Sequence, residues 1–167
     1  MIRLSIVLAA LIVLAAVAHA DINPPGAISD LTAATGHTTA VLSWHEPGDA
    51  CNNHAVSSYD VRMSTSTIDA CNFEAATALS PPAPGSPGNL ACFPIHGLSS
   101  CTTYYFAVRS RDTAGNWSAM SNVPNHQTSC SGSMELECIW VPQVVGGQSM
   151  KLVPHIIGID RDLAVRP

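Results

Sequence analysis

Charged residues are scarce in this sequence, and lysine is almost absent. Only 11% of the 167 residues are charged, Lys151 is the single lysine, and 5% of the residues are aromatic. Seven basic residues stand against twelve acidic ones, so nucleic acid and anionic lipid are disfavoured as partners. The chain is instead rich in Ser, Thr, Ala, Gly and Pro, which suits a β-rich extracellular module better than a helical one.

Motifs for catalysis and for metal binding are also missing. There is no G-x-S-x-G motif, and the adjacent His45 and Glu46 would point to opposite faces of a strand. The histidines after residue 20 are scattered, without H-x-H or H-x-x-x-H spacing. Asp49, Asn52 and Asn53 offer oxygen ligands for Ca²⁺ but lack the EF-hand pattern. We therefore expect no catalytic residue, no metal and no cofactor.

One long apolar run is present, at the N-terminus. Arg3 precedes an apolar stretch over residues 4–18, and the triplet Ala-His-Ala at 18–20 has the pattern of a cleavage site. This predicts a secretory signal peptide over residues 1–20 and a protein that is secreted, periplasmic or at the cell surface, with no membrane span after cleavage. An uncleaved anchor is the alternative, because the run is near the shortest length that spans a bilayer. Loss of Arg3 would leave a net charge of −6.

All six cysteines follow this segment. Export to an oxidising compartment and an even number of cysteines predict disulfide bonds. A zinc site would need paired short spacings such as C-x-x-C, and none occurs. The spacing alone leaves the connectivity open. The six are Cys51, Cys71, Cys92, Cys101, Cys130 and Cys138.

Short extended runs separated by turn signals predict strands along most of the chain. Residues 80–89 contain four prolines and two glycines and are predicted to form a loop. Seven extended runs without a helical period indicate an antiparallel sandwich. Alternation within the runs predicts the inward-facing side chains of the core, which are Trp44, Tyr59, Val61, Tyr104, Phe106 and Val108.

The order of these motifs resembles that of a fibronectin type III domain over residues 24–128. Ser43-Trp44 followed by Pro47 is similar to the family's strand B, and Tyr59-Asp60-Val61-Arg62 is similar to its strand C. Leu98, six residues before Tyr104, resembles the corner between strands E and F. Residues 112–122 resemble the F–G turn of versions common in secreted bacterial proteins.

The resemblance implies an all-β, immunoglobulin-like sandwich of about seven strands within residues 21–130. Tyr104 would bury its ring while its hydroxyl bonds a backbone group a few residues upstream. The start of strand F and the end of strand G share one pole, which implies a Cys101–Cys130 bond. A Cys71–Cys92 bond is expected at the sandwich edge, leaving Cys51 and Cys138 over. Residues 131–167 fall outside the resemblance, as an extension of unknown fold with β-prone runs at 138–141 and 152–159.

The resemblance favours a non-catalytic, monomeric module that binds an extracellular protein or glycan, acts in adhesion, or serves as a spacer. The alternatives are an accessory or truncated part of a larger secreted carbohydrate-active or proteolytic enzyme, and a small secreted ligand or inhibitor. Asn116-Trp117-Ser118 is also a glycosylation sequon. Two interpretations are open for the outward-facing residues. They form a binding patch, or they belong to an ordinary solvated face on which Asp60 offsets the charge of one arginine. Those residues are Arg62, Tyr105, Arg109, Arg111, Asn116 and Trp117.

Overall fold

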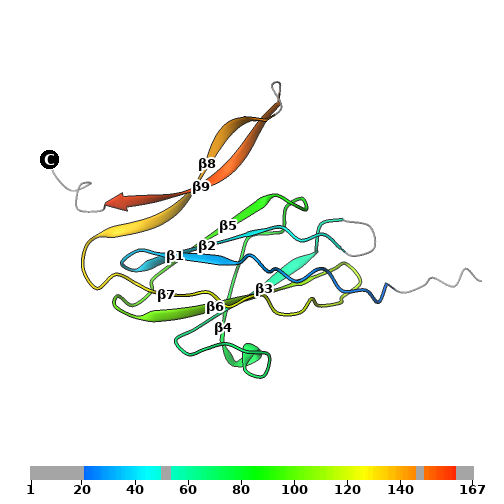
Figure 1. Ribbon diagram of the computed structural model, residues 1–167, viewed down its shortest axis with the longest axis horizontal. Helices are drawn as coiled ribbons and strands as arrows, with labels where there is room; N and C mark the ends of the chain where they lie inside the picture. The colour runs from blue at the N-terminus through cyan, green and yellow to red at the C-terminus, as the bar shows by residue number, and fades with distance from the viewer. Residues whose placement is uncertain (1–20, 50–53, 146–148, 161–167) are drawn as a thin grey trace, which may run out of the picture.

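Two antiparallel sheets and one long hairpin make up the structure (Figure 1). The computed structural model describes residues 21–49, 54–145 and 149–160. The predicted signal peptide and Cys51, Asn52 and Asn53 lie outside the described residues. Within the described ranges the only helical element is the single 3₁₀ turn η1 (Phe73–Ala75). No helix there is long and apolar enough to cross a membrane.

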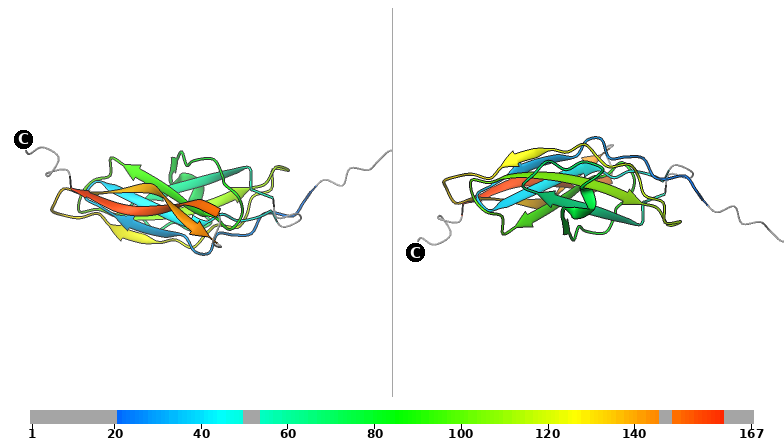
Figure 2. Two further views of the ribbon diagram at one scale, coloured as in Figure 1. Left: turned by 90° about the horizontal axis from the view of Figure 1, so that it is seen from above. Right: turned by 90° about the horizontal axis from the view of Figure 1, so that it is seen from below.

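The smaller sheet has three strands and the larger one has four. In the first sheet β1 (Thr32–Thr35), β2 (Thr39–His45) and β5 (Leu90–His96) follow in the order β1-β2-β5. In the second, β4 (Thr77–Leu79), β3 (Ser58–Ser64), β6 (Thr103–Arg111) and β7 (Asn125–Gln127) follow in the order β4-β3-β6-β7. Figure 1 shows the two sheets as layers one below the other, and they overlap when seen from above and from below (Figure 2).

Side chains from both sheets form one core between these layers. Trp44 of β2 meets the ring of Tyr59 of β3 edge-on, with 5.2 Å between the ring centroids. All six side chains for which alternation predicted an inward direction are buried, none more than 9% exposed. Burial of each such side chain stabilises the fold by roughly 1.5–3 kcal/mol, so the period-two pattern decides which face of each strand points inward.

A tyrosine fixes the crossing from β5 to β6. The Tyr104 ring is buried, and its hydroxyl accepts a hydrogen bond from the backbone N–H of Ser99 at 3.0 Å. Leu98, also buried, donates its own N–H to the carbonyl of Thr38 at 2.9 Å. The connection is therefore held to both sheets by one buried ring and by two hydrogen bonds that its backbone N–H groups donate.

Two disulfides are present among the described residues. Cys101 bonds Cys130, as expected, and joins the start of β6 to the segment after β7. The expected Cys71–Cys92 bond is wrong, because Cys92 bonds Cys138. Cys71 is exposed and forms no disulfide with any described residue. Strand β5 places Cys92 on the side where the C-terminal extension packs, which the sequence did not reveal.

That extension folds as the hairpin of β8 (Met134–Val145) and β9 (Ser149–Asp160). It lies beside β2 and β5, and its far end projects beyond the two sheets (Figures 1 and 2). Its base is bonded to the loop before β2: His37 donates its N–H to the Met134 carbonyl at 2.8 Å, and the buried Glu135 accepts from the Thr38 hydroxyl at 2.7 Å. A Cβ at Gly36 would lie 2.7 Å from that Met134 carbonyl oxygen, so only glycine allows this approach.

The corner hydrogen bond can be tested with Tyr104→Phe. Loss of the hydroxyl leaves the Ser99 N–H without its partner, and we expect the free energy of unfolding to fall by about 1–2 kcal/mol. Urea unfolding of the variant and of Tyr105→Phe measures this, because the half-buried Tyr105 hydroxyl makes no hydrogen bond that the structure records. Equal losses in the two variants would contradict the role given to Tyr104.

The attachment of the hairpin can be tested with the double variant Cys92→Ser, Cys138→Ser. The bond closes a separation of 46 residues, a constraint of about 4 kcal/mol on the loop-entropy model. We expect β8 and β9 to become accessible to protease while the two sheets stay resistant, as mass spectrometry of limited digests would show. An unchanged digestion pattern would mean that other contacts alone hold the hairpin.

Candidate functional site

Four of the residues predicted for binding, Arg62, Arg109, Arg111 and Trp117, come together on the outer face of the larger sheet. The register sets Asp60 of β3 directly opposite Arg109 of β6, and Arg62 opposite Ala107. Residues on the same face of neighbouring strands are within reach of one another. Turn η1 and the segment after β6 add further groups to this face, which makes it a cluster rather than a row of separate side chains.

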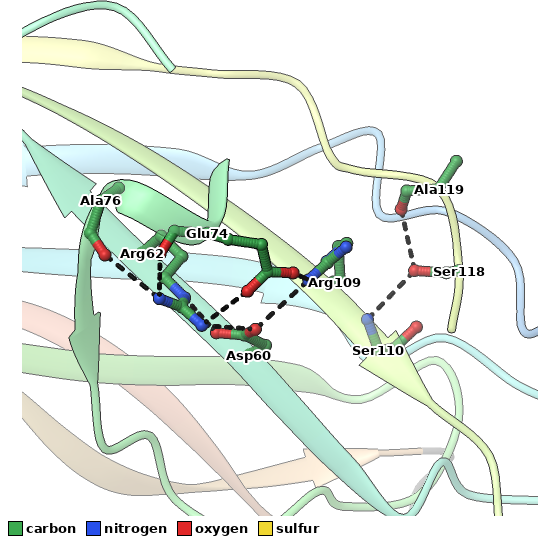
Figure 3. Close-up of polar contacts among 8 residues, drawn as sticks. All are labelled: Asp60, Arg62, Glu74, Ala76, Arg109, Ser110, Ser118 and Ala119. Atoms are coloured by element: carbon green, nitrogen blue, oxygen red, sulfur yellow. Dashed lines mark hydrogen bonds and ion pairs between the residues drawn. The ribbon is translucent and has the colours of Figure 1, made fainter. Parts of the chain in front are cut away.

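Two carboxylates neutralise two of the arginines (Figure 3). Arg62 donates from Nε to Asp60 at 2.6 Å and from an Nη to Glu74 at 3.1 Å. Arg109 bonds Asp60 at 3.4 Å and also Glu74. The hydrogen bond to Asp60 raises the pKa of Arg62 above its ordinary value, although burial opposes the rise. The side chains of Arg62 and Arg109 are 16% and 23% exposed, and their charges are already paired with carboxylates of the protein.

Aromatic rings alternate with the guanidinium groups along the same face. The Arg109 guanidinium lies 4.1 Å from the centroid of Phe73 and 5.4 Å from that of Trp117. The Arg111 guanidinium also lies 5.4 Å from the centroid of the Trp117 ring. Stacking of this kind is attractive because the ring face carries negative charge. The order Phe73–Arg109–Trp117–Arg111 therefore forms a continuous stack, called the arginine–aromatic row below.

Serine hydroxyls explain why Trp117 folds back onto the sheet. Ser118 donates its N–H to the carbonyl of Ser110 at 2.9 Å, and its hydroxyl accepts from the Ser110 N–H at 3.0 Å. The same hydroxyl donates to the carbonyl of Ala119 at 2.8 Å (Figure 3). Ser121 repeats the first two bonds with Val108. The two serines continue the hydrogen bonding along the edge of β6, although the segment that carries them is not a regular strand. They place Trp117 against the sheet, where it is 39% exposed.

Asn116 and Tyr105 stand apart from this row. The Asn116 amide donates to the carboxylate of Asp112 and to the backbone carbonyl of Asp21, each at 2.8 Å. The sequon amide is thus already bonded in the folded chain. Tyr105 packs against the small cluster around Ile68 and Phe73. Asn116 and Tyr105 are therefore both half-buried and in contact with other parts of the fold. Of the three predicted arginines, Arg111 is the exposed one.

His45 and Glu46 point to opposite faces, as strand geometry requires. His45 is exposed and pairs with Asp30 at 2.6 Å. Glu46 is buried and accepts the hydroxyl of Tyr59. Burial raises the pKa of Tyr59, and the bond to Glu46 raises it further. Among the described residues no serine or cysteine bonds His45, so the His45–Asp30 pair is not aimed at a nucleophile.

Sequence reasoning missed the most apolar surface of the protein. Eight large hydrophobic side chains are exposed among the described residues, and six of them belong to the β8–β9 hairpin. The only signal was the apolar character of residues 131–167, which is unusual for a tail. The six, called the hairpin surface below, are Met134, Ile139, Trp140, Leu152, Ile156 and Ile159.

A groove of about 190 Å³ runs between the hairpin and β5. One wall is formed by Trp140, Leu152 and Pro154 of the hairpin, and the Cys92–Cys138 bond joins the two walls. Pro82, Ala83, Gly85 and Asn89 line the other side. Among the described lining residues only Glu46 is charged, so the groove suits an apolar group.

Comparison with solved structures finds similarity at low sequence identity. No protein-family model and no curated protein sequence matches it. It is similar to a solved structure of a myokine, with a TM-score of 0.44 and 16% identity over 63% of this chain and 98% of that one. It is also similar to a β-1,2-glucanase from Parabacteroides distasonis, with a TM-score of 0.42 and 15% identity over 65% of this chain. That match spans 13% of the glucanase.

The arginine–aromatic row can be tested with Arg109→Ala. The change removes two stacking contacts and leaves Asp60 and Glu74 short of one cation. We expect a loss of about 1–3 kcal/mol in the free energy of unfolding. The matched variant Arg111→Ala, which removes one exposed stack, should cost less than about 1 kcal/mol. Denaturant titrations compare the two, and a smaller loss for Arg109→Ala would contradict a structural role for the row.

Proposed function

We propose that this protein is an exported, non-catalytic module of the fibronectin type III type that binds another extracellular protein through its C-terminal hairpin. The observation that carries the proposal is the concentration of exposed apolar side chains on β8 and β9. The strand register places four of them, Met134, Trp140, Leu152 and Ile156, on one face of the hairpin and the other two on the opposite face. Single exposed hydrophobic residues are ordinary on protein surfaces, whereas several of them on one face mark a contact surface.

The strand order supports the fibronectin type III part of the proposal. Sheets ordered β1-β2-β5 and β4-β3-β6-β7, with Trp44 buried between them and Tyr104 at the corner, are what an immunoglobulin-like sandwich of this type requires. Disulfides support export, because such bonds persist in oxidising compartments. Fold alone leaves the function open.

The chemistry of the hairpin surface favours a protein over a glycan as partner. A glycan site needs several polar groups that converge on the sugar hydroxyls, whereas the groove lining is dominated by aliphatic, proline and tryptophan side chains. Among the described strands β9 pairs only with β8, so an extended segment of a partner can add along its outer edge. The base of β8 is instead bonded to the loop before β2 and to the start of β2. We therefore expect an extended apolar segment of another protein to be the occupant.

The test is a binding measurement with the double variant Trp140→Ser, Leu152→Ser. Wild-type protein is immobilised and exposed to the extracellular proteins of the producing organism, and the protein retained is purified. Its dissociation constant is then measured for wild type and variant. Loss of both apolar side chains should weaken binding by at least 10-fold, or about 1.4 kcal/mol, since they flank the groove.

Trp117→Ala is the matched control, because it removes an exposed tryptophan from the arginine–aromatic row. It should leave the affinity unchanged. Equal affinity of wild type and the hairpin variant would overturn the proposal, as would binding to polysaccharides but to no protein. A circular dichroism spectrum shows in each case that the variant is folded.

A further inference from the structure

Three aspartates meet at one end of the two-sheet body. Asp21 lies on the segment before β1, Asp49 lies in the loop after β2, and Asp112 directly follows β6. Figure 1 shows these three parts of the chain at the same end of the molecule. One carboxylate oxygen from each residue lies within 4.8 Å of the others. Three negative groups so close repel one another unless a positive charge stands between them.

Asp49 supplies the observation that points to a ligand. Its side chain is only 7% exposed, and its Oδ1 is buried without any hydrogen-bond partner. A backbone bond from the Asp49 N–H to the His54 carbonyl, at 2.9 Å, holds the residue in this place. Buried polar atoms are nearly always bonded, and a buried carboxylate oxygen with no donor is costly. A cation would satisfy that oxygen.

Asp112 is held in position at the same place by hydrogen bonds. Its Oδ1 accepts the N–H groups of Gly115 and Asn116 at 2.6 and 2.8 Å, and its Oδ2 accepts the Asn116 amide at 2.8 Å. The turn depends on Gly115, whose φ of 101° suits glycine.

No nearby cation neutralises the buried pair. Within the described part of the chain, neither Asp49 nor Asp112 forms an ion pair with a lysine or an arginine. Asn116 bonds the backbone carbonyl of Asp21 as well as Asp112, which brings the N-terminal segment to the cluster. The three carboxylates offer the hard oxygen ligands that Ca²⁺ prefers.

We propose that Asp21, Asp49 and Asp112 bind one Ca²⁺ ion. Two oxygens on the same Ca²⁺ lie at most about 5 Å apart, twice the ordinary Ca²⁺–oxygen distance, and the three carboxylate oxygens meet that limit. Water completes the six to eight ligands that Ca²⁺ takes. The ion fastens the N-terminal segment to two loops. This site shares no residue with the hairpin surface and departs from the sequence-based expectation of no metal.

The experiment is a thermal unfolding titration of the exported, processed chain, stripped with chelator and then given Ca²⁺ or Mg²⁺. At a Ca²⁺ concentration about 100 times the dissociation constant, we expect the unfolding midpoint to rise by about 5–10 °C. Mg²⁺ should give a smaller rise, because it demands a tighter octahedral site. Direct binding of Ca²⁺ is measured by calorimetry on the same samples.

Asp49→Asn and Asp21→Asn test which residues hold the ion. Each keeps the shape of the side chain and removes its charge, and each should abolish the Ca²⁺ response or weaken binding at least 10-fold. If one of the two variants fails to fold, Ca²⁺ binding can still be measured with the other. Asp30→Asn, which removes an exposed carboxylate outside the cluster, should respond like wild type.

Two results would overturn the proposal. The first is a Ca²⁺ response that persists in Asp49→Asn and Asp21→Asn, which would place the ion elsewhere. The second is no response in the processed chain. Cleavage after Ala20 would make Asp21 the first residue, and its ammonium group would then be the positive charge at this end.

Discussion

The disulfide between Cys92 and Cys138 is the constraint on which the position of the proposed contact hairpin depends. It joins the last strand of the smaller sheet to β8, so a hairpin that would otherwise be marginal alone is held against a folded body. The groove beside Trp140 exists because both its walls are tied by this bond. The buried Glu135 and the absence of a side chain at Gly36 add a second point of attachment at the base. Together they present an apolar surface in a fixed position.

Residues that look suited to binding are used here to build the fold. Arg62 and Arg109 invite an acidic partner when read as a sequence, yet Asp60 and Glu74 already pair with them. Trp117 lies on the sheet between two guanidinium groups because serine hydroxyls extend the pairing of β6. The face of the larger sheet is thereby stiffened, and the exposed apolar surface lies on another element. The outer face of the larger sheet thus stabilises the fold, and the hairpin is the proposed contact element.

The local sequence pattern predicted much of the fold but little of the candidate site. Period-two alternation predicted the inward direction of Trp44, Val61 and Phe106, because burial of large side chains decides the face of a strand. The hydrogen bond of Tyr104 and the Cys101–Cys130 bond were implied by the resemblance to a fibronectin type III domain, and both are present. The partner of Cys92 could not be predicted, because it depends on how an extension without a recognised motif packs on β5. The meeting of Asp21, Asp49 and Asp112 depends likewise on loops far apart in sequence.

The claim that the hairpin is the contact element is tested most directly by amide hydrogen exchange of the protein with and without its purified partner. The account predicts that exchange slows in β8, β9 and the adjoining β5, while the outer face of β3 and β6 exchanges as in the free protein. Protection confined to β3, β6 and the segment around Trp117, with β8 and β9 unchanged, would contradict it.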